Sequence, residues 1–231
     1  MAGTVRPMRY RCNVLLNLDG GEYDDEPAEL YVLAHVVHIA CGGHAGDAAS
    51  IRRVSDLCRR ANTRIGAHPS YVDRDSFGRR ALTVEPSLLT AQIEQQCAMM
   101  PGATSVKPHG ALYHAAHAQP DVADAVVQGI TRALGAVPIV GLGGGELERA
   151  ARAAGHPYLR EAFADRGVRA DGSMIPRGDP GALVTDPTLA AERTRAIIAA
   201  GNIETLCCHA DTPDALAIVR AVRAALDSRH A

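Results

Sequence analysis

The stretch VVHIACGGHAGDAASIRRVSDLCRRANTRIGA, residues 36–67, contains a complete strand–helix–strand unit. Residues 36–40 form a short β-rich run, and residues 64–67 form a second one. Between them, Asp47 is placed to cap a helix whose apolar positions recur at helical spacing, namely Ile51, Val54, Leu57, Cys58 and Ala61. A helix that links two short strands is the repeating unit of a parallel α/β fold.

The same alternation extends towards both ends of the chain. Further strands are predicted at residues 11–17, 105–107, 138–141, 159–164 and 205–208. Further helices are predicted at residues 26–34, 86–99, 121–134, 188–200 and 212–226, and another begins at the glycine cluster near Gly143. Asp25 is the predicted N-cap of the helix at 26–34. These roughly seven units are close to the eight of a standard barrel, so we predict a single-domain α/β barrel over residues 1–231. An open doubly wound sheet is the alternative.

Composition and charge exclude several classes of protein. The formal net charge is −2 and the basic residues form no stripe, so a nucleic-acid partner is not expected. No apolar run approaches the ~20 residues of a membrane span, and the opening residues MAGTVRPMRYR have no apolar stretch behind their charges. The 6 cysteines lack the paired spacing of a metal knuckle, so reduced, buried thiols are expected. We therefore expect a cytoplasmic protein.

Ionisable residues of catalytic character follow the predicted strands at the point where each strand ends. In a parallel α/β fold these ends meet at one edge, where active sites form. The opposite loops contain mostly Gly, Pro, Ala, Arg and Thr, so the general polarity of loops does not explain the pattern. The residues at the predicted edge are Asn17, Asp19, Glu22, His44, Asp47, His68, Lys107, His109, Asp165, Arg166, His209 and Asp211.

Lys107 is the only lysine among the 24 Lys and Arg residues of the chain. The chain therefore supplies its general surface charge with arginine. A lysine at the end of an apolar strand, before Pro108, indicates a task for a compact ammonium group, such as donating protons or facing an oxyanion. The alternative is a lysine without a functional role, whose side chain merely extends from the strand end to water.

Five histidines lie in or beside the strand-end segments: His38, His44, His68, His109 and His209. Histidine is the usual acid–base group near neutral pH, and with aspartate it is also a metal-ligand set. No HExxH or HxH spacing defines a metal site, so a divalent metal is left open. The glycine run at 141–146 could hold an anion or simply form a tight turn. No GxxxxGK[ST] motif is present, so no P-loop nucleotide site is predicted.

Motifs along nearly the whole chain resemble, in order, those of the LamB/YcsF family, the A subunits of bacterial 5-oxoprolinase. The most distinctive are HIACGGHAGD at 38–47 and VKPHGALY at 106–113. The others are NLDGGE at 17–22, IGAHP at 65–69, FGRR at 77–80, ADR at 164–166, Arg177 with PGA at 180–182, and HADTP at 209–213. Together they are far more specific than any single motif.

The resemblance implies a deformed, seven-stranded β/α barrel related to carbohydrate deacetylases. It implies ATP-dependent opening of the 5-oxoproline lactam to glutamate, together with subunits B and C. ATP then acts at the level of the complex. It does not imply that this chain binds ATP alone.

Roles for the site residues follow as hypotheses from the resemblance and from the chemistry of a lactam. Catalytic roles are expected for Asp19 or His44 as base, Lys107 as electrostatic stabiliser, and His68 or His109 as acid. Substrate binding is expected from Arg79 and Arg177 as clamps for a carboxylate or phosphate. The remaining members of the expected substrate-binding set are Asn17, Glu22, Asp47, His209 and Asp211.

The chain departs from the family pattern at four positions, and two rival functions remain. Leu15 stands where the family has Asp, His38 and His114 stand where it has Asn, and Ala210 stands where it has Gly. The segments before Ser105 and before Thr205 are also shorter than is usual in the family. One rival is a metal-dependent amide or carbohydrate deacetylase, and the other is a non-catalytic substrate-binding subunit. With 3% aromatic residues, the composition does not separate a monomer from a homo-oligomer.

Overall fold

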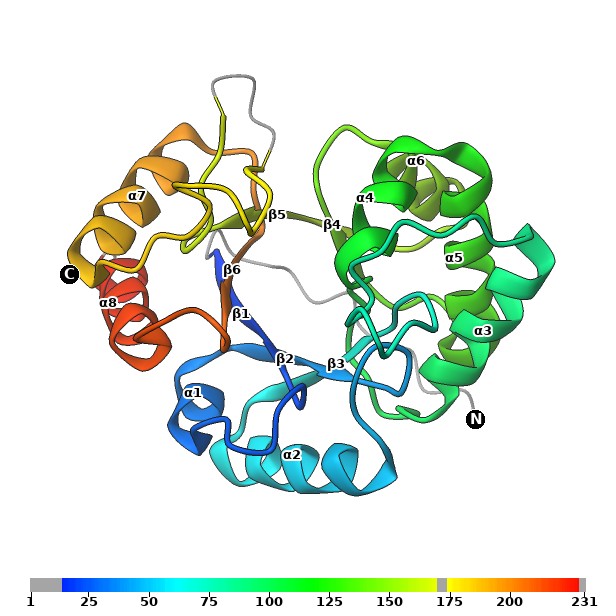
Figure 1. Ribbon diagram of the computed structural model, residues 1–231, viewed down its shortest axis with the longest axis horizontal. Helices are drawn as coiled ribbons and strands as arrows, with labels where there is room; N and C mark the ends of the chain where they lie inside the picture. The colour runs from blue at the N-terminus through cyan, green and yellow to red at the C-terminus, as the bar shows by residue number, and fades with distance from the viewer. Residues whose placement is uncertain (1–13, 170–173, 229–231) are drawn as a thin grey trace, which may run out of the picture.

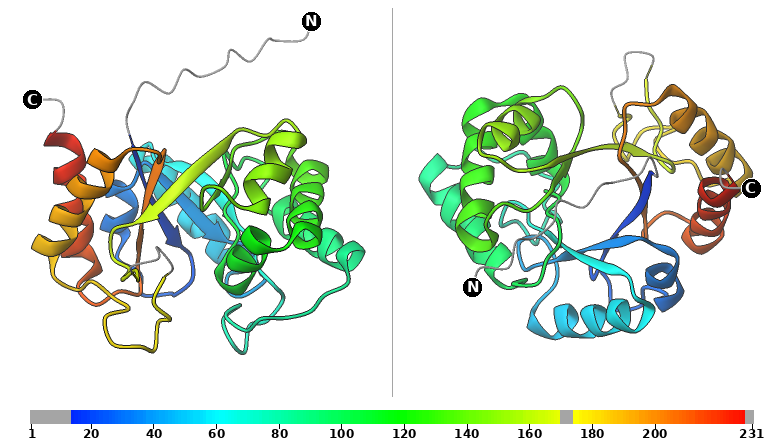
Figure 2. Two further views of the ribbon diagram at one scale, coloured as in Figure 1. Left: turned by 90° about the horizontal axis from the view of Figure 1, so that it is seen from above. Right: turned by 180° about the vertical axis from the view of Figure 1, so that it is seen from behind.

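The computed structural model describes residues 14–169 and 174–228, which form an α/β fold with a six-stranded parallel sheet (Figure 1). The strands are β1 Leu15–Gly20, β2 Val36–Ala40, β3 Arg64–His68, β4 Ile139–Gly141, β5 Tyr158–Phe163 and β6 Thr205–His209. The helices are α1 Ala28–Leu33, α2 Ala48–Ala61, α3 Pro86–Ala98, α4 Gly110–Ala118, α5 Pro120–Leu134, α6 Glu146–Ala153, α7 Pro187–Ala200 and α8 Ala215–Asp227. They surround the strands as an outer layer (Figure 2).

The sheet closes into a barrel because its two edge strands, β3 and β4, both form a backbone bridge to the same residue. The strand order is β3-β2-β1-β6-β5-β4, and Val106 makes parallel bridges to Ala67 on β3 and Ile139 on β4. The segment predicted as a strand at 105–107 is thus present only as this bridge. Pro108 follows at once and has no amide hydrogen, so it cannot extend the ladder. With this bridge the ring has seven segments, which confirms the deformed barrel over the open sheet.

Strand alternation separates the hydrophobic core from a polar interior. Leu16 and Leu18 of β1 point outwards and are almost completely buried in the core, while Asn17 and Asp19 point to the opposite face. On β6, Cys208 belongs to the main core, whereas Cys207 belongs to a separate small cluster. All five cysteines that the structure describes are buried, free thiols. No helix in the described part of the chain is long and apolar enough to cross a membrane.

Two details at the start of the chain differ from the prediction. The first strand is Leu15–Gly20 and not residues 11–17, of which 11–13 lie outside the described residues. Asp25 is not the N-cap of α1, because the helix begins after Pro27, which makes no side-chain capping bond. A residue that precedes a proline is disfavoured in the helical region, so Glu26 does not join the helix and Pro27 takes the N-cap position.

Candidate active site

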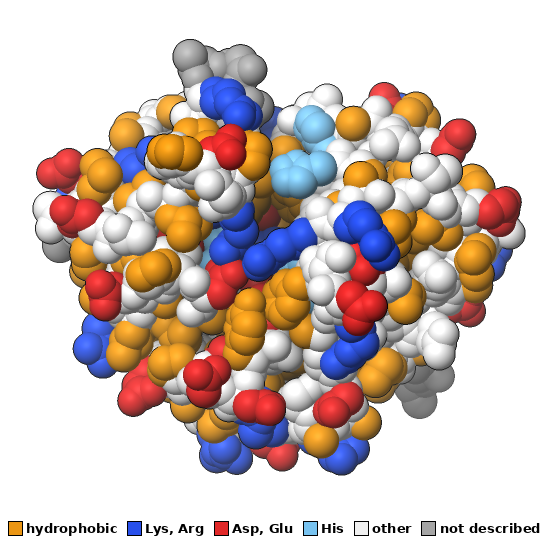
Figure 3. Space-filling view, in the orientation of Figure 1, with side chains coloured by type: hydrophobic (Ala, Val, Ile, Leu, Met, Phe, Trp, Pro, Cys, Tyr) orange, Lys and Arg blue, Asp and Glu red, His pale blue; other side chains and the backbone are white. Residues whose placement is uncertain are grey.

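A cavity of about 900 Å³ opens at the carboxyl ends of the strands. Arginine side chains gather across its mouth, with histidines beside them (Figure 3). Its lining includes eight of the predicted catalytic and substrate-binding residues: Asp19, Glu22, His68, Arg79, Lys107, His109, Arg177 and His209. The cavity lies at the edge where the topology of a parallel barrel places active sites.

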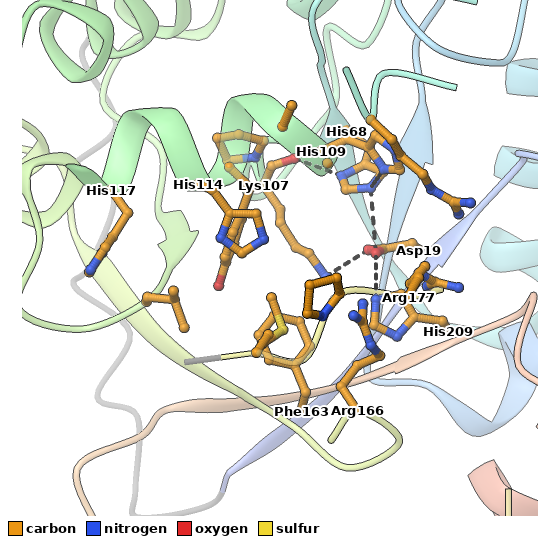
Figure 4. A pocket seen from close by; sticks show the side chains of 18 of the residues that line it. Asp19, His68, Lys107, His109, His114, His117, Phe163, Arg166, Arg177 and His209 are labelled. Carbon is orange, nitrogen blue, oxygen red and sulfur yellow. Dashed lines mark hydrogen bonds and ion pairs between the residues drawn. The ribbon is translucent and has the colours of Figure 1, made fainter. Parts of the chain in front are cut away.

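Lys107 lies at the floor of this cavity, surrounded by acceptors from neighbouring strands. Its Nζ is 2.7 Å from Asp19 Oδ1 (Figure 4). The same Nζ is 3.1 Å from Glu161 Oε1. It also donates to Asn17 Oδ1 at 3.2 Å and contacts Cys207 Sγ at 3.1 Å. Since Asn17, Asp19 and Cys207 share the inner face of adjacent strands β1 and β6, the sheet itself positions the ammonium group.

The electrostatics keep both members of the Lys107–Asp19 pair ionised. Burial alone would raise the pKa of Asp19, but the positive charges of His68 and Lys107 outweigh it and hold that pKa well below its usual range. Burial would lower the pKa of Lys107, but the charge of Asp19 outweighs it and raises that pKa well above its usual value. The cavity floor therefore presents a charged ammonium beside a weakly basic carboxylate.

Glu161 and Tyr113 complete this cluster, and neither was predicted as a site residue. Glu161 is buried on β5, accepts from Asn17 Nδ2 at 2.8 Å, and accepts from the Tyr113 hydroxyl at 3.0 Å. The available signal was a glutamate inside the strand YLREAF. A buried carboxylate without a partner is costly, so a glutamate at this position indicates a paired cation. Its partner Lys107 is far away in sequence, so the pairing could not be read from the strand alone.

His209 is held by a carboxylate in the manner of an acid–base histidine. Its Nδ1 is 2.9 Å from Asp165 Oδ1, and its backbone amide donates to Asp165 Oδ2 at 2.9 Å. The Thr212 hydroxyl donates to the same carboxylate at 2.7 Å, so Asp165 is fully engaged. The other ring nitrogen, Nε2, faces the cavity 3.7 Å from Asp19 Oδ2. This arrangement leaves one imidazole nitrogen free to exchange a proton with a bound molecule.

A second cluster of titratable groups lies beside the first, around Glu22. Glu22 Oε1 is 3.0 Å from His44 Nε2, 3.2 Å from His109 Nδ1 and 3.7 Å from His68 Nε2. His109 Nδ1 is in turn 3.0 Å from His68 Nε2. The two clusters touch where His68 Nε2 approaches Asp19 Oδ2 at 3.5 Å. Glu22, His68 and His109 line the cavity, whereas His44 lies behind them.

Burial and hydrogen bonds determine the charges in this second cluster. Burial lowers the pKa of His44 to about 3, and burial also lowers the pKa of His109, so both rings are neutral. Burial would raise the pKa of Glu22, but its close contacts with His109 and His44 outweigh burial and lower that pKa well below its usual value. The pKa of His68 is raised because the charge of Asp19 outweighs the effect of burial. Of the three histidines in this cluster, His68 is therefore the one that binds an additional proton most readily.

Arg79 and Arg177 meet across the mouth of the cavity. Both bind Asp211 Oδ2, Arg79 through Nη2 at 2.9 Å and Arg177 through Nη1 at 2.6 Å. Asp211 thus holds two guanidinium groups at the entrance, where a planar cation can pair with a carboxylate or phosphate of a bound molecule. Asp211 itself does not line the cavity.

Asp47 and three of the positions that depart from the family pattern lie in different surroundings. Asp47 is exposed and caps α2, accepting from the amides of Ala49 and Ser50, so the structure does not bring it to the cavity. Leu15 lies at the start of β1, four positions before Asp19, and does not line the cavity either. His38 is buried with its Nε2 3.0 Å from Ser105 Oγ. His114 lines the cavity wall from α4 (Figure 4).

Comparison with known proteins places this geometry in a family. The model of the LamB/YcsF family matches residues 20–231. The chain is 38% identical over 240 residues to the 5-oxoprolinase A subunit of Streptomyces avermitilis, covering 92% of this chain and 95% of that protein. It is 44% identical over 210 residues to the 5-oxoprolinase A subunit of Streptomyces griseus subsp. griseus, covering 82% of this chain and 84% of that protein.

Solved structures agree with the sequence comparison. The lactam utilization protein from Thermus thermophilus superposes with a TM-score of 0.84 and 32% identity, covering 94% of this chain and 97% of that one. An uncharacterized protein from Agrobacterium tumefaciens C58 superposes with a TM-score of 0.60 at 13% identity, over 93% of this chain and 85% of that one, and shares the fold alone. The chain therefore belongs to the LamB/YcsF family.

Proposed function

We propose that this single-domain chain is the A subunit of an ATP-dependent 5-oxoprolinase, which opens the lactam of 5-oxo-L-proline to give L-glutamate. The observation that carries the proposal is the buried Lys107–Asp19 pair on the cavity floor, with His209 Nε2 3.7 Å from Asp19. The names of the two Streptomyces relatives and of the Thermus protein support the choice of a lactam. Both Streptomyces relatives are named as subunits, which supports a complex, and we propose subunits B and C as the partners.

ATP enters the proposed reaction at the level of this complex. An unactivated lactam is a poor electrophile, and transfer of a phosphoryl group from ATP to its oxygen creates a leaving group. Water then adds to the ring carbon that bears the phosphorylated oxygen, and the ring C–N bond breaks once its nitrogen is protonated, which leaves an acyl phosphate. A second water molecule releases the phosphate. The chain has no GxxxxGK[ST] motif, so the phosphoryl transfer is assigned to a partner subunit.

His209 is the group best placed to move protons in this sequence of steps. Its Nε2 takes a proton from the attacking water and returns one to the ring nitrogen, while Asp165 holds Nδ1. Asp19 is a weak base because its pKa is held low, so it orients the water. Lys107 stabilises the negative charge that develops on the reacting carbon's oxygen. In this proposal His209 takes the base role expected for Asp19 or His44 and the acid role expected for His68 or His109.

The test is glutamate release from 5-oxo-L-proline with ATP, for this chain alone and mixed with subunits B and C. Activity is expected only in the mixture. His209→Asn is expected to lower kcat by about 10²–10⁴-fold, the usual contribution of a general acid–base group. Asp47→Ala is the matched control, because Asp47 is an exposed helix cap, and it is expected to retain kcat. Folded protein that releases no glutamate in any mixture contradicts the proposal.

A metal-dependent deacetylase is the second candidate, favoured by the Glu22, His44, His68 and His109 cluster. Such an enzyme needs neither ATP nor partner subunits. Acetate release from acetylated amides or sugars by the chain alone, lost on chelation, would establish this function in place of lactam opening.

A further inference from the structure

The donors of the second cluster come from four separate segments of the chain. Glu22 follows β1, His44 follows β2, His68 ends β3, and His109 precedes α4. One atom from each lies within 4.8 Å of the other three. The proposed lactam chemistry uses none of the four. Four buried or nearly buried donors that converge from four segments need a physical explanation, because their burial is costly unless they are paired.

The backbone determines which ring nitrogens of His68 and His109 carry their protons. His68 Nδ1 is 2.7 Å from the carbonyl oxygen of Lys107, and His109 Nε2 is 3.0 Å from that of Phe77. A carbonyl oxygen only accepts, so each of these nitrogens must donate. The neutral rings therefore direct their lone pairs at each other, from His68 Nε2 to His109 Nδ1, across 3.0 Å. Glu22 Oε1 adds a negative charge to the same space.

Two lone pairs and a carboxylate that face one another require a cation between them. An additional proton on His68 is one solution, and a metal ion is the other. The three donor atoms are separated by 3.0, 3.2 and 3.7 Å. Ligands that surround a tetrahedral Zn²⁺ at its usual bond lengths of about 2.0–2.1 Å are about 3.3 Å apart. The spacing thus already matches a coordination shell.

His44 is a supporting group and not a fourth ligand. Its ring stacks on that of His109 with centroids 3.6 Å apart and an interplanar angle of 5°. Imidazole lone pairs lie in the ring plane, so one ion cannot lie in the planes of two parallel stacked rings. His44 Nε2 instead bonds Glu22 Oε1 at 3.0 Å and orients that carboxylate. His44 is also the one member of the cluster that does not line the cavity.

We propose that His68 Nε2, His109 Nδ1 and a carboxylate oxygen of Glu22 bind one Zn²⁺-class divalent cation whose open coordination positions face the cavity. Two imidazoles and one carboxylate suit Zn²⁺ or a neighbouring transition metal and not Ca²⁺ or Mg²⁺, which prefer oxygen ligands. Both histidines donate their outer N–H to a backbone carbonyl, which is the usual second contact of a metal-bound histidine.

The neighbouring group of Asp19, Cys207 and His209 offers a control within the same cavity. Its three donor atoms also lie within 4.8 Å of one another. Lys107 Nζ, however, is 2.7 Å from Asp19 and 3.1 Å from Cys207, so this group already contains a cation. A metal ion there would have to displace a buried ammonium. We therefore assign the ion to the Glu22 side only.

The test measures metal content and not activity. Its result is therefore independent of whether the protein opens a lactam. The full chain, purified without a histidine tag, is treated with chelator, and Zn²⁺ or Co²⁺ is titrated back by calorimetry and elemental analysis. One equivalent per chain is expected, and the visible d–d absorption of bound Co²⁺ reports nitrogen and oxygen ligands. Folded protein that binds neither ion, with a proton shared between His68 and His109 in ¹⁵N NMR spectra, overturns the proposal.

Variants separate ligands from supporting groups. His109→Ala and Glu22→Gln are expected to abolish stoichiometric Zn²⁺ binding, and the isosteric Glu22→Gln covers the case in which His109→Ala fails to fold. His44→Ala is expected to weaken Zn²⁺ affinity by about 10–100-fold, as for other groups that orient a ligand. His209→Asn is the matched control and is expected to leave Zn²⁺ affinity unchanged. Loss of Zn²⁺ in His209→Asn with retention in Glu22→Gln would place the ion on the other group and overturn the assignment.

Discussion

At the scale of single residues, Lys107 shows how one side chain serves both stability and chemistry. It is buried, and it neutralises Asp19 and Glu161, which are also buried. Lys107→Met leaves two carboxylates without their cation, so the free energy of unfolding is expected to fall by about 3–5 kcal/mol. Denaturant unfolding measures the loss. Arg149→Met, which removes an exposed cation beside Asp124, is the control and is expected to change it by less than about 1 kcal/mol. Equal losses in the two variants would contradict this account.

His35 lies outside the cavity, and its protonation is expected to make the free energy of unfolding depend on pH. Its Nδ1 accepts from the amide of Leu16 at 2.8 Å, and burial, together with the charges of Arg223 and Arg64, lowers its pKa. The unfolded chain therefore binds this proton more readily than the folded one. The stabilisation is complete above the unfolded pKa of about 6.5 and is lost as pH falls towards the lower folded pKa.

The measurement is the free energy of unfolding from pH 8 to pH 5 for the wild type and for His35→Asn, whose amide oxygen can still accept from Leu16. The wild type is expected to lose more stability than the variant over this range. Parallel pH profiles for the two proteins would remove His35 as the cause.

At the scale of elements, Asp47 tests whether a conspicuous acidic residue is structural or functional. It accepts from two amides at the start of α2, and Ser50 completes a capping box. Asp47→Ala is expected to lower the free energy of unfolding by about 1 kcal/mol. The KM for 5-oxo-L-proline is expected to be unchanged, because Asp47 does not line the cavity. A raised KM in a variant of unchanged stability would restore the substrate-binding role predicted from the sequence.

The packing of β2 against β3 depends on a glycine opposite a histidine. A Cβ at Gly66 would lie 2.3 Å from His38 Cδ2, so Gly66→Ala overpacks the barrel interior and is expected to cost about 1–3 kcal/mol. In a His38→Ala background the ring is gone, and the same change is expected to cost much less. A double-mutant cycle measures the coupling. Strictly additive effects would show that His38 moves aside without cost.

The elements that could be predicted are those whose signals are local. Asp47 begins α2 and Pro86 begins α3 as expected, because an N-cap and an N1 proline act within one turn. Asp25 was the wrong N-cap because Pro27 competes with it two residues later. Helix α4 was not predicted, since its nine residues, GALYHAAHA, are too few for a clear apolar period.

At the scale of the whole molecule, the barrel has a weak seam where Val106 joins β3 to β4. On the β4 side of the seam, Val106 N donates to Pro138 O at 2.9 Å and Val140 N donates to Val106 O at 2.8 Å. On the β3 side, Ala67 N donates to Ser105 O at 2.9 Å and Lys107 N donates to Ala67 O at 3.0 Å. The pair β1–β2 has a continuous register over four residues. Amide hydrogen exchange is therefore expected to be faster at Val106 and Val140 than at Leu18 in β1. Uniform protection around the ring would contradict a seam.

The sequence by itself determined the fold class, the family and the edge of the sheet at which the cavity lies. The fold class depends on local periodicity, the family on the motifs along the chain, and the position of the cavity on the rule that parallel strands bring their carboxyl ends to one edge. Only the tertiary structure decided which residues pair. Lys107 with Asp19 and Glu161, His209 with Asp165, and Glu22 with three histidines are contacts between distant segments. Such contacts depend on strand register, ring orientation and burial, and none of these has a periodic signal along the chain.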